Sequence, residues 1–217
     1  MPVGGTEVWI VPLDPDTGAI GRCMTLLSGD ELERAGRFHF ECDRRHFTIA
    51  RGTLRMLLGA RLAVDPKAVR FGRTEKGKLF VIGATLHFNV SHSHERALIV
   101  ISDSRPVGVD IEYLHREIDH AALAARFLTS KEQACYAATP ADLRARFFLE
   151  CWTRKEAVAK ASGEGLGYGF AKLDTLPPED TAADRSRDTM LERAGWLIRG
   201  LPTDNDYVAA LALRAET

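Results

Sequence analysis

Two acidic side chains share one face of a short apolar segment, Pro106–Glu112 (PVGVDIE). Its β-branched residues predict a strand, and because side chains alternate along a strand, Asp110 and Glu112 point to the same side. Carboxylate oxygens suit Mg²⁺, which takes one or two protein carboxylates and completes its shell with water and phosphate oxygens. A solvated strand face would also tolerate the two charges. The segment alone therefore leaves both a metal site and an exposed face open.

A third carboxylate lies in a predicted helix further along the chain. Pro140 suits the first turn of this helix and Gly163 its C-terminal stop, which places Glu156 and Lys160, four residues apart, on one face. An ordinary surface ion pair is one interpretation of this spacing. Trp152 precedes Glu156 by four residues on the same face, however, and so large an aromatic side chain favours a partly buried cleft edge, although a tryptophan is more often part of a core than of a site.

Two neighbouring segments could hold an anion. His87–His94 (HFNVSHSH) combines serine, histidine and turn amides that can hydrogen-bond a phosphate, and it lacks the four-ligand set of a zinc site. Thr74–Lys78 (TEKGK) adds two ammonium groups on a turn that contains glycine, although a solvated hairpin turn is equally typical of this segment alone. From Arg44 to Lys78 the chain has ten basic residues and only two acidic ones. This excess favours a local anion site.

The elements that must position these residues occur twice in the same order, as strand, helices and strands. In the first half we expect a strand at Glu7–Leu13, a helix opened by the capping box Ser28–Glu31, a helix from Phe47 to Asp65-Pro66, and strands at Lys78–Ile82, Leu86–Val90 and Arg96–Ser102. In the second we expect a strand at Val107–Glu112, helices within His120–Ser162, a surface loop at Leu176–Met190, and strands near Trp196–Arg199 and Tyr207–Leu213. We therefore predict an α+β fold of two pseudo-twofold-related α/β subdomains, residues 1–104 and 105–217, with the active site in the cleft between them.

Composition narrows the class of protein. The 217 residues are 45% apolar and 27% charged, which is typical of a globular protein. The 29 basic and 30 acidic residues give a net charge of −1, which excludes nucleic-acid binding driven by bulk charge. The sequence contains no run of about 18 apolar residues, so we expect no membrane-spanning helix. The N-terminus lacks the basic and apolar regions of a secretory signal. We expect a cytoplasmic protein.

Four motifs in series resemble the 4′-phosphopantetheinyl transferases of the surfactin-synthetase-activating type. They are Phe88–Ser93 (FNVSHS), Gly108–Glu112 (GVDIE), Phe127–Glu132 (FLTSKE) and Trp152–Ala157 (WTRKEA), followed by Lys160 and Gly163–Leu166. Each motif alone is modest, but their order and spacing are specific, and the resemblance runs from about Ser28 to Leu166. It implies a monomer that resembles two copies of a smaller trimeric carrier-protein synthase subunit joined in one chain.

The resemblance implies transfer of the phosphopantetheine arm of coenzyme A to a serine of an acyl or peptidyl carrier protein, with release of adenosine 3′,5′-bisphosphate. It implies that Mg²⁺ bridges to the pyrophosphate and is held by Asp110, Glu112 and Glu156. Lys160 would contact the coenzyme A phosphates, with Lys155 as a helper. The 3′-phosphate or its surroundings would be bound by Lys78, Ser91 and His92.

This sequence departs from the usual family pattern at two positions, and a third position has two possible roles. Where the family usually has an arginine, this chain has His46, preceded by Arg45, and either side chain could supply the phosphate contact. The usual Gly-Lys-Pro becomes Gly77–Leu79, which keeps the ammonium. Glu132 matches an acidic position of the family, but Thr129–Glu132 is also a capping box, and we consider this structural role at least as well supported.

The attacking serine needs a base, for which we expect Glu156, with Glu112 as the rival. Two other functions would use the same residues. One is a different Mg²⁺-dependent phosphotransferase or pyrophosphate-cleaving hydrolase, and the other is a non-catalytic module that binds coenzyme A or docks a partner. The first explains the carboxylates and the basic stretch, but neither explains four motifs in series.

Overall fold

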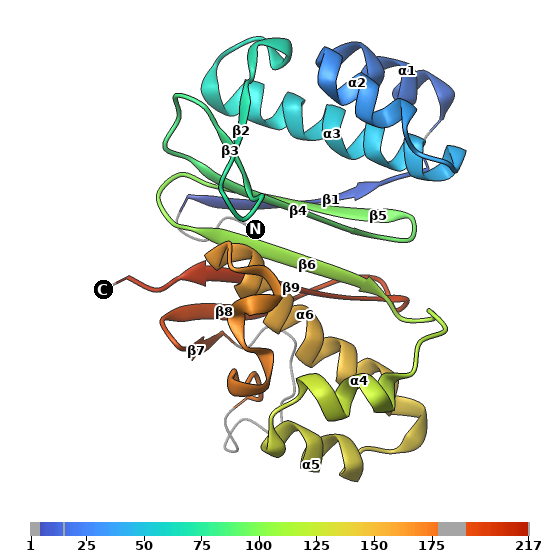
Figure 1. Ribbon diagram of the computed structural model, residues 1–217, viewed down its shortest axis with the longest axis vertical. Coiled ribbons are helices and arrows are strands. Elements are labelled where there is room, and N and C mark those ends of the chain that lie inside the picture. Colours follow the sequence, from blue (N-terminus) through green and yellow to red (C-terminus); the bar gives the residue numbers. More distant parts are fainter. Residues whose placement is uncertain (1–4, 15, 178–189, 217) are drawn as a thin grey trace.

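Two antiparallel sheets stack face to face in the computed structural model, which describes residues 5–14, 16–177 and 190–216 (Figure 1). The first sheet has the strand order β1-β5-β4, formed by Thr6–Pro12, Arg96–Ser102 and His87–Ser93. The second has the order β6-β9-β8-β7, formed by Val107–Tyr113, Tyr207–Arg214, Trp196–Leu201 and Leu191–Arg193. Helices pack on the outer face of each sheet, so the layers run helix, sheet, sheet, helix.

Helix α3 (Glu41–Leu62) packs on the first sheet, and α1 (Thr17–Leu26) and α2 (Gly29–Gly36) pack against α3. The capping box predicted for α2 is present, with the Ser28 amide donating to the Glu31 carboxylate at 3.0 Å. α3 buries the predicted apolar stripe against β5, but it begins at Glu41, before that stripe starts. The stripe marks the buried part of the helix, and the polar first turns carry no such signal.

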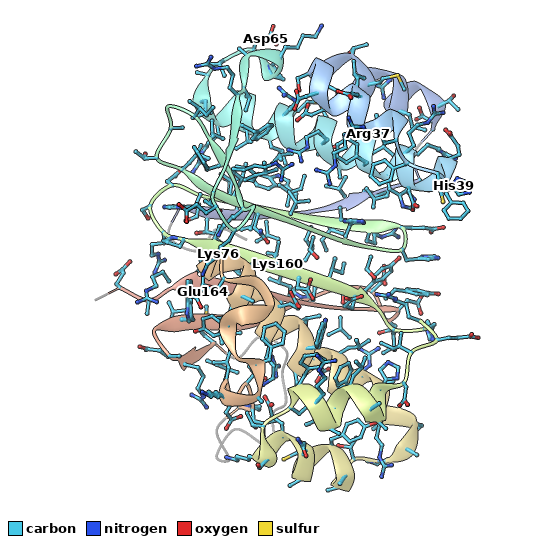
Figure 2. The ribbon with its side chains drawn as sticks, viewed as in Figure 1. Arg37, His39, Asp65, Lys76, Lys160 and Glu164 are labelled. Atoms are coloured by element: carbon cyan, nitrogen blue, oxygen red, sulfur yellow. The ribbon has the colours of Figure 1, made fainter. Side chains whose placement is uncertain are left out.

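A small hairpin extends from the first half toward the second. Its strands β2 (Phe71–Arg73) and β3 (Leu79–Val81) pair antiparallel after the 3-10 turn η1 (Pro66–Ala68). The sequence predicts β3 but not β2, because three residues that include a glycine give no alternating pattern. Figure 2 shows Lys76 of the hairpin turn near Lys160, which lies in the last helix of the second half.

The second half is built on one long helix, α6 (Arg144–Ser162). Ala157 and Ala161 of α6 pack on Ala210 and Ala212 of β9, and these small side chains let the helix lie close to the sheet. The other helical elements are α4 (His120–Phe127), α5 (Ser130–Ala138), η2 (Ala141–Leu143), η3 (Gly165–Tyr168) and η4 (Phe170–Lys172). Gly163 ends α6 in the left-handed conformation, with φ of 78°, as predicted.

Strand β5 joins the two halves because both of its faces are buried. Leu98 and Val100 point into the core shared with Val109 and Ile111 of β6, while Ile99 points to the core under α3. Side-chain alternation thus lets one strand serve two cores. The predicted α+β fold of two α/β halves is confirmed.

Two expectations need correction or restriction. Pro140 precedes the turn η2 and does not open α6, which starts at Arg144. The predicted surface loop Leu176–Met190 lies largely outside the described residues.

The sequence does not predict strand β7, because three residues give too short an alternating pattern. Within the described ranges, no helix is both long and apolar enough to cross a membrane.

Gly108 of β6 supports the first prediction. A Cβ at this position would overlap the Ala157 carbonyl oxygen and the Ala161 amide nitrogen of α6. Gly108→Ala should therefore lower the free energy of unfolding by about 3 kcal/mol or more, since backbone atoms must move apart. Urea denaturation measures the change. Gly21→Ala is the control: Gly21 lies in α1 with open space around it, and the change should stabilise by about 0.5–1 kcal/mol. Equal stability of Gly108→Ala and the wild type would contradict the packing.

Candidate active site between the two halves

Strands β4 and β6 lie side by side but belong to different sheets. In place of a backbone ladder, alternate side chains of β4 accept hydrogen bonds from alternate backbone amides of β6. The pairs are Asn89 Oδ1 with Val109 N (3.0 Å), Ser91 Oγ with Ile111 N (3.4 Å) and Ser93 Oγ with Tyr113 N (3.0 Å). The polar residues of the FNVSHS motif thus join the two halves.

The same two serines position the carboxylates of β6. Ser91 Oγ donates to Asp110 Oδ1 at 2.8 Å, and Ser93 Oγ donates to Glu112 Oε2 at 3.0 Å. Arg116 also donates to Glu112 Oε2, at 3.0 Å. The Ser91 hydroxyl, predicted to contact the 3′-phosphate or its surroundings, is buried and instead holds Asp110. The sequence motif could not predict this contact, because it does not indicate which neighbouring group a serine hydroxyl hydrogen-bonds.

Asp110 has one paired and one unpaired oxygen. Lys160 Nζ lies 2.6 Å from Oδ1 and 2.8 Å from Ser91 Oγ. Oδ2 is buried and has no hydrogen-bond partner among the described residues. Burial raises the pKa of Asp110, and the Lys160 ammonium opposes this shift. A buried carboxylate oxygen without a partner is a position that a cation would satisfy.

Glu156 of α6 is the third carboxylate near Asp110 and Glu112, and these three side chains together form the acidic group of the site. Burial raises the pKa of Glu156 to about 7, with Asp110 and Glu112 adding to the rise and Lys160 opposing it. Within the described ranges, no three side chains already converge as a metal site. The oxygen donors still fit Mg²⁺, because this ion usually keeps several waters and binds through one or two carboxylates together with substrate phosphate.

A cavity of about 700 Å³ lies between the two halves, next to this acidic group. The first half lines it with parts of α2, α3, the β2–β3 hairpin and β4, and the second half with the end of α6. The lining is strongly basic and includes Arg34, His46, Arg51, Arg73, Lys76, Lys78, His92 and Lys160, with Asp43 as its acidic member. Lys160 connects the two regions, since it lines the cavity and contacts Asp110.

The structure separates His46 from Arg45. His46 lines the cavity, whereas Arg45 Nη2 pairs with Asp14 Oδ1 at 2.7 Å and is not part of the lining. Burial lowers the pKa of both cavity histidines, His46 and His92. Of the two alternatives at this position, only His46 faces the space where a phosphate would bind.

Lys78 lines the cavity, but its ammonium is engaged elsewhere. Nζ donates to the carbonyl oxygens of Lys160 and Ala161, both at 2.7 Å, and of Val107 at 3.3 Å. Burial lowers the pKa of Lys78 to about 8. The predicted contact of Lys78 with the 3′-phosphate would require breaking these hydrogen bonds.

A stack of arginines and phenylalanines, which the sequence patterns did not predict, starts at the cavity wall with Arg34, Phe47 and Arg51 and continues into the neighbouring second cavity with Phe71 and Arg55. The guanidinium carbons of Arg34 and Arg51 lie 5.1 and 5.7 Å from the centre of the Phe47 ring. Those of Arg51 and Arg55 lie 5.0 and 5.2 Å from the centre of the Phe71 ring. The spacing of four residues between Phe47, Arg51 and Arg55 on α3 was a usable signal. The contributions of Arg34 and Phe71 come from other elements.

This stack carries excess positive charge. Glu31 is shared, with its carboxylate 2.6 Å from Arg55 Nε and 3.5 Å from Arg51 Nε. Burial lowers the pKa of Arg51, and the neighbouring guanidiniums, Arg34 among them, lower it further against the effect of Glu31. Arg51 also lines a second cavity of about 390 Å³ beside the first. Arg55 is buried and satisfied by Glu31 and two carbonyl oxygens, whereas Arg34 and Arg51 face the cavity with too few carboxylates, which favours an anionic ligand there.

Lys155 does not reach the cavity, and its predicted role as a helper in coenzyme A binding is corrected. Its side chain is fully buried, with Nζ 2.7 Å from the Glu132 carboxylate. It also donates to the carbonyl oxygens of Phe170 and Leu173. Glu132 forms the predicted capping box with Thr129 as well. The neighbours Lys155 and Glu156 necessarily point in different directions on a helix, so only one of them can face the cleft.

This buried pair yields a second prediction. Lys155→Met leaves the Glu132 carboxylate buried without its cation, so the free energy of unfolding should fall by about 3–5 kcal/mol. Urea denaturation of the variant measures the loss. The double variant Glu132→Gln with Lys155→Met should be more stable than Lys155→Met alone, because it removes the uncompensated charge. A Lys155→Met protein with wild-type stability and a raised KM for coenzyme A would restore the original assignment.

Two protein-family models match this chain, one in each half. Residues 13–104 match the family described as 4′-phosphopantetheinyl transferase, N-terminal, and residues 106–212 match the 4′-phosphopantetheinyl transferase superfamily. The 4′-phosphopantetheinyl transferase HetI of Nostoc is 36% identical over 95% of this chain and 86% of its own length.

Two further relatives are more distant. A phosphopantetheinyl transferase of Thraustochytrium is 31% identical over 98% of this chain and 80% of its own length. The 4′-phosphopantetheinyl transferase Sfp of Bacillus subtilis is 30% identical over 67% of this chain and 64% of its own length. The basic cavity, the acidic group beside it and these matches over both halves have one explanation: the chain belongs to the 4′-phosphopantetheinyl transferase superfamily and is a 4′-phosphopantetheinyl transferase.

Proposed function

We propose that the chain moves the phosphopantetheine arm of coenzyme A onto a serine of an acyl or peptidyl carrier protein, using Mg²⁺ held by Asp110, Glu112 and Glu156. The proposal rests on the position of Lys160. This residue lines the basic cavity, and its Nζ lies 2.6 Å from Oδ1 of the buried Asp110 carboxylate. A polyphosphate in the cavity would therefore end beside the acidic group. When bound, Mg²⁺ neutralises pyrophosphate charge.

The protein's own residues then orient and activate the reactants. Lys160, His46 and His92 offer the nucleotide phosphates positive or hydrogen-bonding groups from the cavity wall. The serine oxygen forms a bond to the phosphorus of the phosphopantetheine phosphate. The bond from that phosphorus to the bridging oxygen breaks, and adenosine 3′,5′-bisphosphate leaves.

Glu156 is our candidate for the base that takes the serine proton. No hydrogen bond engages its carboxylate in the part of the chain that the structure describes, whereas Glu112 Oε2 already accepts from Ser93 and Arg116. Because the Glu156 carboxylate is not held by a hydrogen bond from these described residues, it can turn toward the serine hydroxyl, and this favours Glu156 over Glu112.

The acidic group gives a third prediction. Asp110→Asn and Glu156→Gln should each reduce labelling of an apo carrier protein by about a hundredfold or more, since each removes a charge that holds the metal. Mass spectrometry of the carrier serine measures the transfer, across a panel of fatty-acid, polyketide and nonribosomal-peptide carriers. Thermal unfolding confirms that the variants fold.

The same assay separates the alternatives. Removal of Mg²⁺ with a chelator should abolish labelling of the wild-type protein, and added Mg²⁺ should restore it. Near-normal labelling by either variant would refute the metal assignment. Release of phosphate without carrier modification would indicate a hydrolase, and tight binding of coenzyme A without turnover on any carrier would indicate a binding module.

The arginine stack gives a fourth prediction. Arg51→Met should raise the KM for coenzyme A by about tenfold and change kcat by less than about twofold, because the lost cation contributes to binding the nucleotide end. Arg37→Met is the matched control. Arg37 directly follows α2, is exposed, pairs with Glu33 and does not line the cavity, so the KM should stay unchanged. A wild-type KM in Arg51→Met would remove the stack from the binding site.

A further inference from the structure

The Lys78 ammonium connects the two halves of the molecule. Lys78 belongs to the turn of the β2–β3 hairpin, in the first half. All three of its acceptors, the carbonyl oxygens of Val107, Lys160 and Ala161, belong to the second half. No carboxylate pairs with this ammonium within the described ranges. The hydrogen bonds therefore engage backbone oxygens alone.

Two of these acceptors, the carbonyl oxygens of Lys160 and Ala161, lie at the C-terminal end of α6, where a cation stabilises a helix. The last carbonyl oxygens of a helix have no intrahelical donors, and the aligned peptide dipoles place partial negative charge there. Lys160 and Ala161 belong to the last turn of α6 before Gly163. The three hydrogens of one ammonium match three acceptors. The methylenes of Lys78 are close by as well, since a Cβ on Gly163 would lie 3.5 Å from Cδ.

These backbone atoms belong to the two elements that carry the acidic group. Val107 starts β6, which bears Asp110 and Glu112, and Lys160 is one turn after Glu156 on α6. The carbonyl of Lys160 accepts from Lys78, while its own ammonium holds Asp110 and Ser91. Two lysines in series thus link the hairpin to the acidic group.

We propose that Lys78 is a positioning residue: its ammonium clamps the end of α6 and the start of β6 to the hairpin, which sets Lys160 and the carboxylates at the distance that transfer requires. In this role Lys78 acts through Lys160 and the backbone. It does not bind the 3′-phosphate of coenzyme A. The kinetic part of the proposal rests on the transferase function proposed above.

Arginine distinguishes the two roles. A guanidinium is a planar fork suited to phosphate, so a phosphate contact tolerates Lys→Arg. It is one bond longer than lysine and spreads its donors over three nitrogens, so it fits poorly where three carbonyl oxygens converge on one nitrogen. Lys76 offers a matched comparison, because it lies on the same turn, lines the same cavity and is exposed.

The experiment measures kcat and the KM for coenzyme A in Lys78→Met, Lys78→Arg, Lys76→Met and Lys76→Arg. Both Lys78 variants should lose about tenfold to a hundredfold in kcat, with KM changed by less than about twofold, because misplaced groups slow the chemical step. Lys76→Met should raise KM, and Lys76→Arg should restore it. Wild-type kinetics in Lys78→Arg, or a raised KM with normal kcat in Lys78→Met, would overturn the proposal.

Hydrogen exchange tests the clamp without relying on activity. With no coenzyme A present, amides of residues 158–163 should exchange faster in both Lys78 variants than in the wild type, while those of β1 should not change. Unchanged exchange at the end of α6 would refute the clamp. A protein that labels no carrier but shows faster exchange in the variants would refute the proposed function and leave the clamp standing.

Discussion

The active site depends on the way β4 meets β6. These two strands are neighbours without a backbone ladder, and the side chains of Asn89, Ser91 and Ser93 accept hydrogen bonds from β6 amides in its place. A side-chain bridge holds the strands further apart than a ladder would, and it leaves the serine hydroxyl hydrogens free to donate. Those hydrogens go to Asp110 and Glu112. One set of contacts therefore joins the halves and orients the acidic group.

Charge is divided between the halves in a way that suits a polyphosphate substrate. The first half supplies most of the basic residues of the cavity wall. Arg34 and Arg51 of this wall belong to the Arg34–Phe47–Arg51–Phe71–Arg55 stack, which holds guanidiniums close together without a carboxylate for each. The second half supplies the three carboxylates. Lys160 lies between these regions and lowers the cost of burying Asp110. The opposing charges favour a ligand whose phosphates face the cavity wall and whose reacting bond faces the carboxylates.

Much of the fold follows from local patterns. Sequence patterns predict the capping boxes at Ser28 and Thr129, the glycine stop of α6 and the span of β5, because each rests on residues close together in sequence. They do not predict strands β2 and β7, because a three-residue strand is specified by its partner strand and not by its own alternation. The start of α3 was missed for a related reason, since its first turns contribute nothing to the apolar stripe.

The chemical types are evident from the order of residues alone: carboxylates at alternate positions of one strand, Glu156 and Lys160 on one helix face, and a basic stretch that could meet phosphate. Which polar atoms are free to bind a ligand depends on contacts between distant segments. Lys155 is paired with Glu132, Ser91 with Asp110 and Lys78 with the end of α6, whereas His46 and Arg51 face the cavity. The reason is physical: a polar side chain is satisfied by the first suitable partner within reach, and those partners come from segments distant in sequence.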